Sequence, residues 1–228
     1  TSTGGALGVN TKVNDDAGIA KQWDPSITID AAGNFVLAWI DERNNNYDIY
    51  YQRYTSTGGV LGVNTKVNDD AGNAEQTSPD ILTDVAGNFV IVWQDFRNAN
   101  WDIYFQRYTG TGGALGVNTK VNDDTEGEFQ MYPSISMDAV GNFVIVWQDS
   151  RNSDWDIYYQ RYTSIGAALG ANIRVNDDAD NMYQKIPSIS MDGVGNFVIV
   201  WQDYRYGQSN SDIIGQRYYS TGTSCKFV

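Results

Sequence analysis

Histidine is absent from this sequence of 228 residues, and cysteine occurs once, at Cys225. Without histidine the chain lacks the side chain that is most used for acid–base catalysis at neutral pH and for binding transition metals. We therefore expect neither a serine–histidine triad nor a zinc site. A single cysteine forms no internal disulfide, so the fold must be stabilised by packing and strand pairing.

Positive charge and long apolar runs are also scarce. Lys and Arg number 15 against 28 Asp and Glu, which gives a formal net charge of −13. This charge repels nucleic-acid phosphates and anionic lipid headgroups, so we expect no nucleic-acid partner. No apolar run approaches the roughly 18 residues that a membrane-spanning helix needs, and we expect no membrane insertion.

The sequence contains instead a repeat. Gly87–Trp93 reads Gly-Asn-Phe-Val-Ile-Val-Trp and recurs unchanged at Gly141–Trp147 and Gly195–Trp201, and with two changes at Gly33–Trp39. The first glycines of these segments are 54 residues apart. A fixed period of this size indicates a repeat protein. The repeats within this single domain of residues 1–228 are approximately 1–54, 55–108, 109–162 and 163–218, with a tail at 219–228.

Each repeat has four short stretches with the patterns of β-strands, and none has helical periodicity. In the third repeat Ser134–Asp138 alternates small polar and apolar residues, and Phe143–Trp147 is apolar on both faces, as in a buried strand. Tyr158–Tyr162 alternates aromatic and polar residues. The pattern predicts an all-β fold, a β-propeller of four blades with four antiparallel strands each.

Two local features suggest how the blades are built. A proline recurs three residues after a glutamine, as Pro133 follows Gln130, and we expect it at the entry of the inner strand, where a missing N–H is tolerated. Leu7–Asn14 has the pattern of an outer strand, and we expect it to complete the last blade and close the ring within one chain. The same strand exchange between chains would instead give an oligomer or a filament.

The repeat resembles propeller repeats of large secreted bacterial proteins, and more loosely the blades of sialidase-like and Asp-box propellers. The resemblance rests on Pro-Ser-Ile, Asp-x-x-Gly-Asn-Phe-Val-Ile-Val-Trp-Gln-Asp-x-Arg-Asn and Asp-Ile-Tyr-x-Gln-Arg-Tyr, and it covers the whole chain. It implies an extracellular protein, secreted or on the cell surface. It implies no particular activity, because such repeats occur in adhesive, binding and enzymatic proteins.

The motif Asp-x-Arg follows the tryptophan in every repeat, as in Asp95 and Arg97. An internal ion pair is the simplest interpretation. A sialidase-like cluster of arginines would have to converge on one pocket, which symmetric copies do not readily provide.

The loop after this motif has two interpretations. Oxygen ligands at alternate positions are typical of calcium loops, and they occur here at Asn98, Asn100, Asp102, Asn152, Asp154 and Asp156. Alternatively, these side chains cap turns by bonding to their own backbone. Calcium is the only cofactor that the sequence suggests.

Aromatic residues in the loops are the other candidates for a site. Tyr47, Trp101 and Trp155 share one position, and Trp23 and Tyr132 lie where the repeats diverge. Aromatic rings beside Asn and Asp are typical of sugar-binding sites, so these five residues are the predicted ligand-binding set. The alternative is that Tyr47, Trp101 and Trp155 pack between blades.

We therefore expect a non-enzymatic binding or scaffold module with a glycan or protein ligand on an acidic face. A self-assembling structural unit and a glycoside-processing enzyme are the alternatives. An enzyme would need two carboxylates of different pKa. Its candidates are the loop glutamates Glu42, Glu75, Glu126 and Glu128.

Overall fold

The computed structural model describes residues 6, 8–124, 127–178, 182–207 and 209–225. Within these residues the chain forms β-strands and no helix, and so no helix long and apolar enough to cross a membrane. The strands make four separate antiparallel sheets of four strands each. This confirms the predicted all-β propeller of four blades.

The strands follow one another in chain order within each sheet. The first sheet contains β1 (Gln22–Ile29), β2 (Phe35–Asp41), β3 (Asp48–Tyr54) and β4 (Val60–Lys66). The second contains β5 (Gln76–Thr83), β6 (Phe89–Asp95), β7 (Asp102–Tyr108) and β8 (Ala114–Lys120). The third contains β9 (Gln130–Met137), β10 (Phe143–Asp149), β11 (Asp156–Tyr162) and β12 (Ile173–Arg174). The fourth contains β13 (Gln184–Met191), β14 (Phe197–Asp203), β15 (Asp212–Tyr218) and β16 (Ser224–Cys225).

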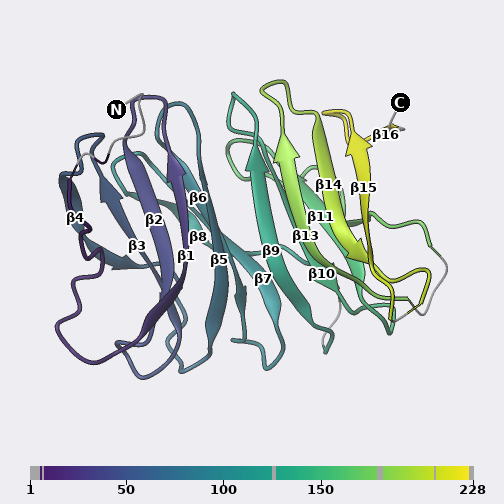
Figure 1. The fold of residues 1–228 in the computed structure, drawn as a ribbon, viewed down its shortest axis with the longest axis horizontal. Coiled ribbons are helices and arrows are strands. Elements are labelled where there is room, and N and C mark those ends of the chain that lie inside the picture. Colours follow the sequence, from purple (N-terminus) through teal and green to yellow (C-terminus); the bar gives the residue numbers. More distant parts are fainter. Residues whose placement is uncertain (1–5, 7, 125–126, 179–181, 208, 226–228) are drawn as a thin grey trace.

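The four sheets stand side by side as the blades of an arc (Figure 1). Neighbouring blades meet through their first strands, β1 with β5, β5 with β9 and β9 with β13, so these are the inner strands. The first and fourth sheets lie at the two ends of the row (Figure 1). Their inner strands are not packed against each other in the described part of the chain.

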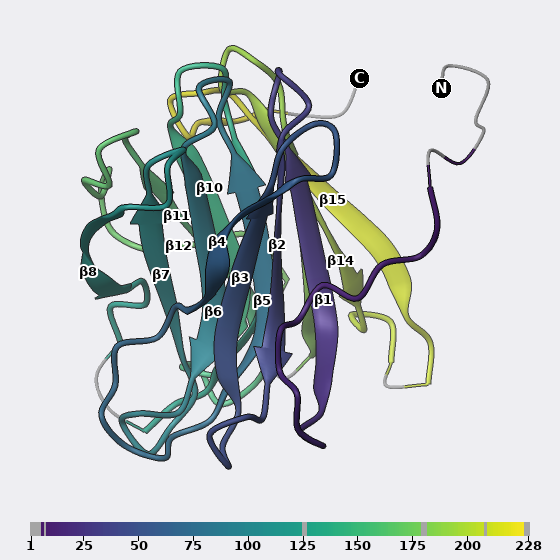
Figure 2. The ribbon, with the colours of Figure 1, turned by 90° about the vertical axis from the view of Figure 1, so that its left-hand side faces the viewer.

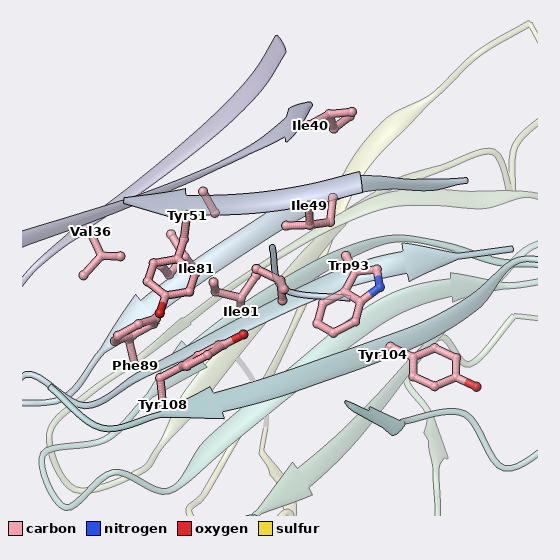
Figure 3. Close-up of a cluster of buried hydrophobic side chains, with 12 residues drawn as sticks. Val36, Ile40, Ile49, Tyr51, Ile81, Phe89, Ile91, Trp93, Tyr104 and Tyr108 are labelled. Carbon is pink, nitrogen blue, oxygen red and sulfur yellow. The ribbon is translucent and has the colours of Figure 1, made fainter. Parts of the chain in front are cut away.

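The core lies between the blades rather than within one of them. Between the first two blades, Val36, Ala38 and Tyr51 of the first pack against Ile91 and Trp93 of the second (Figure 3). The repeated segment supplies most of this core, since β6 and β10 are buried along their whole length. Equivalent clusters fill the next two junctions.

The expected closure of the ring by the N-terminal segment is wrong. Of the expected strand Leu7–Asn14, Leu7 lies outside the described residues and Gly8–Asn14 carries no strand, and the fourth position of the last sheet is taken by β16. The segment is held at the first blade instead, where the N–H of Asp15 donates to Asn64 Oδ1 at 2.7 Å. Asp15 also pairs with Arg43 at 2.7 Å. Seen from the first blade, the segment crosses in front of β1 (Figure 2).

The expected place of the prolines is also wrong. Each inner strand begins at the glutamine, because the backbone of Gln22 already pairs with that of Asp41. Pro25 therefore lies inside β1, where the register with β2 shifts between Trp23 and Ser26. A β-bulge leaves its extra residue unpaired, so a proline without an N–H is accommodated there.

Candidate functional site

The bulges of the inner strands place one unusual residue of each blade at the centre of the arc. The residue before each proline has a positive φ of 52–54°, although none of the four is a glycine. These residues are Asp24, Ser78, Tyr132 and Ile186. Strained backbone of this kind is often found at functional sites, and bulges commonly redirect a side chain there.

Two carboxylates break the symmetry of the inner strands. Asp24 occupies the bulge position of β1, where the other repeats have Ser, Tyr and Ile. Asp80 follows the proline of β5, where every other repeat has serine. β1 and β5 are neighbouring inner strands. An asymmetric reaction needs such departures from the repeat, since identical copies give only identical environments.

Asp80 links three blades through its carboxylate. Its Oδ1 accepts a hydrogen bond from Ser26 Oγ of the first blade at 2.9 Å and from the N–H of Ile81 at 2.9 Å. Its Oδ2 accepts from Ser134 Oγ at 3.2 Å and from the N–H of Ile135 at 3.1 Å, both in the third blade. Four donors therefore hold this carboxylate in one orientation between the blades.

Asp24 lies in a different environment. Asp24 is exposed, and its partial burial against the strand raises the pKa of its carboxyl above the ordinary value. A carboxylic acid that keeps its proton more readily can donate it to a leaving group. The two carboxylates are thus chemically distinct, one fixed by four donors and the other biased toward its protonated form.

Two residues of the predicted ligand-binding set lie on inner strands, Trp23 in β1 and Tyr132 in β9. Tyr132 occupies the same bulge position in β9 as Asp24 does in β1, and it is 44% exposed. Its N–H donates to Gln94 Oε1 of the preceding blade at 3.0 Å, which fixes its backbone. An exposed aromatic ring at the centre of the arc is suited to stacking on a sugar.

The other four aromatic residues are half-buried near the junctions between blades. Trp23 contacts Tyr47 edge to face, with ring centroids 4.9 Å apart, and both pack against the core of the first junction. Trp101 contacts Phe96 at 5.1 Å. The backbone oxygens of Trp101 and Trp155 accept bonds from the first residues of β9 and β13, at 2.7 and 2.6 Å. They line the rim from which the inner strands start.

The residues of the predicted calcium loops bond to each other. Oδ1 of the fully buried Asp102 pairs with Lys120 Nζ at 2.7 Å and accepts from Asn122 Nδ2 at 2.8 Å. Its Oδ2 accepts from Asn98 Nδ2 at 2.7 Å, and Asn100 Nδ2 donates to Oδ1 at 3.4 Å. The lysine ammonium and the amides occupy the directions that a cation would take.

The equivalent loop of the third blade has the same arrangement. Asn152 Nδ2 donates to Asp156 Oδ2 at 2.6 Å and to Tyr158 Oη at 3.0 Å. Asp154, which lies between these residues in the sequence, is buried. No group of three or more His, Cys, Asp or Glu suited to a metal occurs among the described residues. These asparagine amides bond to other side chains rather than to their own backbone, and calcium stays a prediction.

The expected ion pair of the Asp-x-Arg motif is present. Nε and Nη2 of Arg97 donate to the two carboxylate oxygens of Asp95 at 3.0 and 2.8 Å, and Trp93 Nε1 donates to Oδ2 at 2.8 Å. The guanidinium also lies over the ring of Tyr104, 4.3 Å from its centroid. The motif therefore joins strands within a blade and does not form an arginine pocket.

Asp24 and Asp80 were not among the residues predicted from the sequence. The loop glutamates were considered instead, but Glu126 lies outside the described residues, and Glu42, Glu75 and Glu128 lie outside the inner strands. The signal was nevertheless present. When the repeats are aligned with their period of 54 residues, Asp80 corresponds to serine in the other three repeats. Asp24 corresponds to serine, tyrosine and isoleucine.

The fold and the site together define a β-propeller with a pair of unlike carboxylates on its inner strands. No protein-family model matches the sequence, and no curated protein matches it. Solved structures do match the fold. The α-L-arabinofuranosidase of Fusarium graminearum in complex with arabinobiose has a TM-score of 0.64 at 11% identity, over 90% of this chain and 65% of that chain.

Two further matches have similar names. The α-L-arabinanase of Penicillium chrysogenum complexed with arabinobiose has a TM-score of 0.55 at 14% identity, over 84% of this chain and 64% of that chain. The endo-arabinase of Bacteroides thetaiotaomicron has a TM-score of 0.51 at 12% identity, over 86% of this chain and 75% of that chain. The chain thus spans less than two thirds of the length of two of these three proteins.

These matches overturn the expectation of a non-enzymatic binding or scaffold module. The matching structures named here are glycoside hydrolases, and two of them contain bound arabinobiose. At 10–14% identity the likeness shows a common fold. The earlier alternative, a glycoside-processing enzyme, agrees better with these matches.

Proposed function

We propose that the chain is a glycoside hydrolase, or the larger part of one, that acts on arabinose-containing glycans at the inner strands. The observation that carries this proposal is the pair of carboxylates Asp24 and Asp80, which depart from the repeat on adjacent inner strands. Glycoside hydrolysis requires one carboxylic acid and one carboxylate near the scissile bond. The names of the structural neighbours support the substrate class.

The two environments suggest which carboxylate plays which role. Asp24, with its raised pKa, donates a proton to the glycosidic oxygen. Asp80, held by four donors on the neighbouring strand, is the second carboxyl group, and it takes the proton of the water that attacks the anomeric carbon as the glycosidic bond breaks. Tyr132 stacks on an apolar face of a sugar unit. An extracellular location, expected from the resemblance, stays a prediction.

Assays on debranched arabinan and on an aryl α-L-arabinofuranoside test this proposal. Asp24→Asn and Asp80→Asn are each expected to lower kcat/KM on the order of 10²–10⁴-fold, because each removes a group that the reaction needs. Asp177→Asn is the matched control, since its carboxylate is 88% exposed at the rim. Thermal melts of all three variants establish that they fold.

Two outcomes would contradict the proposal. One is that the wild-type chain hydrolyses none of these substrates. The other is that Asp24→Asn and Asp80→Asn keep the rate of the Asp177→Asn control, which would mean that any hydrolysis takes place elsewhere.

A further inference from the structure

The two ends of the arc expose the two halves of an interface that the chain itself forms three times. Each blade has two faces. The face that packs on the next blade along the chain is called its back, and the face that packs on the preceding blade is called its front. The front of the first blade and the back of the fourth have no such neighbour among the described residues (Figure 1). We propose that a second copy of the chain docks there end to end.

The front of the first blade has the side chains of an inner junction but is only partly covered: Trp39 is buried, and Val13 and Asn14 line a shallow cavity with it. Ile81 and Ile135, at equivalent positions of the second and third blades, are 3% and 5% exposed in the junctions. Ile27, their counterpart in the first blade, is 61% exposed, and Ile29 beside it is 66% exposed. Phe35 and Leu37 continue the face, because they pair with Ile29 and Ile27 across β1 and β2.

The back of the fourth blade is the complementary surface. Ile49, Ile103 and Ile157 are fully buried in the three inner junctions, whereas their counterpart Ile213 is 72% exposed. Val200 is 37% exposed, whereas Val92 and Val146 at the same position are fully buried. Apolar side chains that are buried in the inner junctions and exposed at one end indicate a surface that is covered in an assembly.

A polar contact also crosses each inner junction, and its two halves are found separately at the two ends of the arc. Asn68 Nδ2 donates to Asp48 Oδ1 of the first blade at 2.8 Å and to Gln76 Oε1 of the second at 2.6 Å. Asn122 and Asn176 make the same two kinds of contact at the following junctions.

At the ends this contact is incomplete. Asn14 Nδ2 donates to Gln22 Oε1 at 2.9 Å, and among the described residues it has no bond to an aspartate of another blade. Asp212, the counterpart of Asp48, is exposed and accepts no asparagine amide from any described residue. The buried Nε2 of Gln22 also lacks a hydrogen-bond partner. Docking would bring Asn14 of one copy to Asp212 of another.

The front and back surfaces are different, so the contact is head-to-tail, and each copy uses both ends. Such contacts close into a ring when the rotation allows it and otherwise give a filament. The junction is weaker than the inner ones in one respect. Gly215 stands where the other blades have Tyr51, Phe105 and Tyr159, so an aromatic contact is missing. We therefore expect association that depends on protein concentration.

Sedimentation velocity over a wide range of protein concentration tests the proposal. The wild-type chain is expected to shift from monomer to multiples of its mass as concentration rises. Ile27→Asp and Ile213→Asp are each expected to remain monomeric at concentrations where the wild type is largely associated, because each places a charge in an apolar contact. Val85→Asp is the control, a 66% exposed valine in a hairpin turn of the second blade.

Mixing the two variants distinguishes this contact from a symmetric one. The variant Ile27→Asp keeps an intact back and Ile213→Asp an intact front, so an equimolar mixture should form a species of twice the monomer mass and nothing larger. Gly215→Tyr should move wild-type association to lower concentration. A wild-type chain that stays monomeric throughout, or association that Ile27→Asp and Ile213→Asp leave as strong as in the Val85→Asp control, would overturn the proposal.

Discussion

At the scale of single residues, the carboxylate of Asp95 illustrates how the repeat is stabilised. The side chain is fully buried and accepts bonds from Trp93, Arg97 and Gln76, so it ties together two strands of the blade and the loop that follows. Arg97 extends to Asp69 in the preceding loop at 2.7 Å. The guanidinium of Arg97 thus bonds to two carboxylates, the buried one of Asp95 and the exposed one of Asp69.

Replacing Asp95 by alanine is expected to lower the free energy of unfolding by about 2–4 kcal/mol. The change leaves a guanidinium and an indole N–H without their shared acceptor. Arg97 keeps some access to water, which holds the loss below that of a fully buried charge. Asp69→Ala is the control: its carboxylate is 48% exposed, so about 0–1 kcal/mol is expected. Urea unfolding measures both, and equal losses would refute this explanation.

At the scale of strands and loops, the sequence predicted what depends on local pattern. Phe143–Trp147 falls within β10, and the Tyr158–Tyr162 segment falls within β11. The N-terminal segment was predicted wrongly because its sequence is nearly that of β4. β4 follows β3 through a short turn and pairs with it, whereas Gly8–Asn14 pairs with no strand among the described residues. Strand propensity alone does not supply a partner.

The loops after the Asp-x-Arg motif give a prediction at the same scale. Because Lys120 and asparagine amides already satisfy Asp102, we expect the thermal midpoint to be the same in chelator and in excess calcium. Lys120→Met is expected to lower the midpoint, since it leaves the buried Asp102 without its cation. If chelation lowered the midpoint of the wild type by several degrees, these loops would be calcium sites after all.

At the scale of the whole molecule, the number and order of blades could be predicted from the period of 54 residues. The openness of the arc could not, because it depends on the angle between blades, which the repeat does not encode. The candidate site was missed for a related reason. Asp24 and Asp80 are far from each other in sequence, and only the stacking of inner strands brings β1 and β5 together.

The whole molecule also has a predictable response to pH. No histidine is present, so no side chain of ordinary pKa titrates between about pH 5 and 8, and stability should be flat there. On the acid side, burial would raise the pKa of the Asp41 and Asp203 carboxyls, but bonds from Arg43, Arg205 and two tryptophans lower it below the ordinary value. Their contribution is present above about pH 4 and is lost as pH falls through the lowered pKa.

Tyrosines in the blade junctions determine how stability falls at alkaline pH. Burial raises the pKa of Tyr108, Tyr162 and Tyr218 well above its ordinary value. A hydroxyl of raised pKa contributes stability below the unfolded value, about 10, and this is lost as pH rises further. Urea unfolding from pH 3 to 11 should therefore give a plateau with a fall on each side. Tyr108→Phe should reduce the alkaline fall without changing the acid one, whereas a step near pH 6.5 would contradict this assignment.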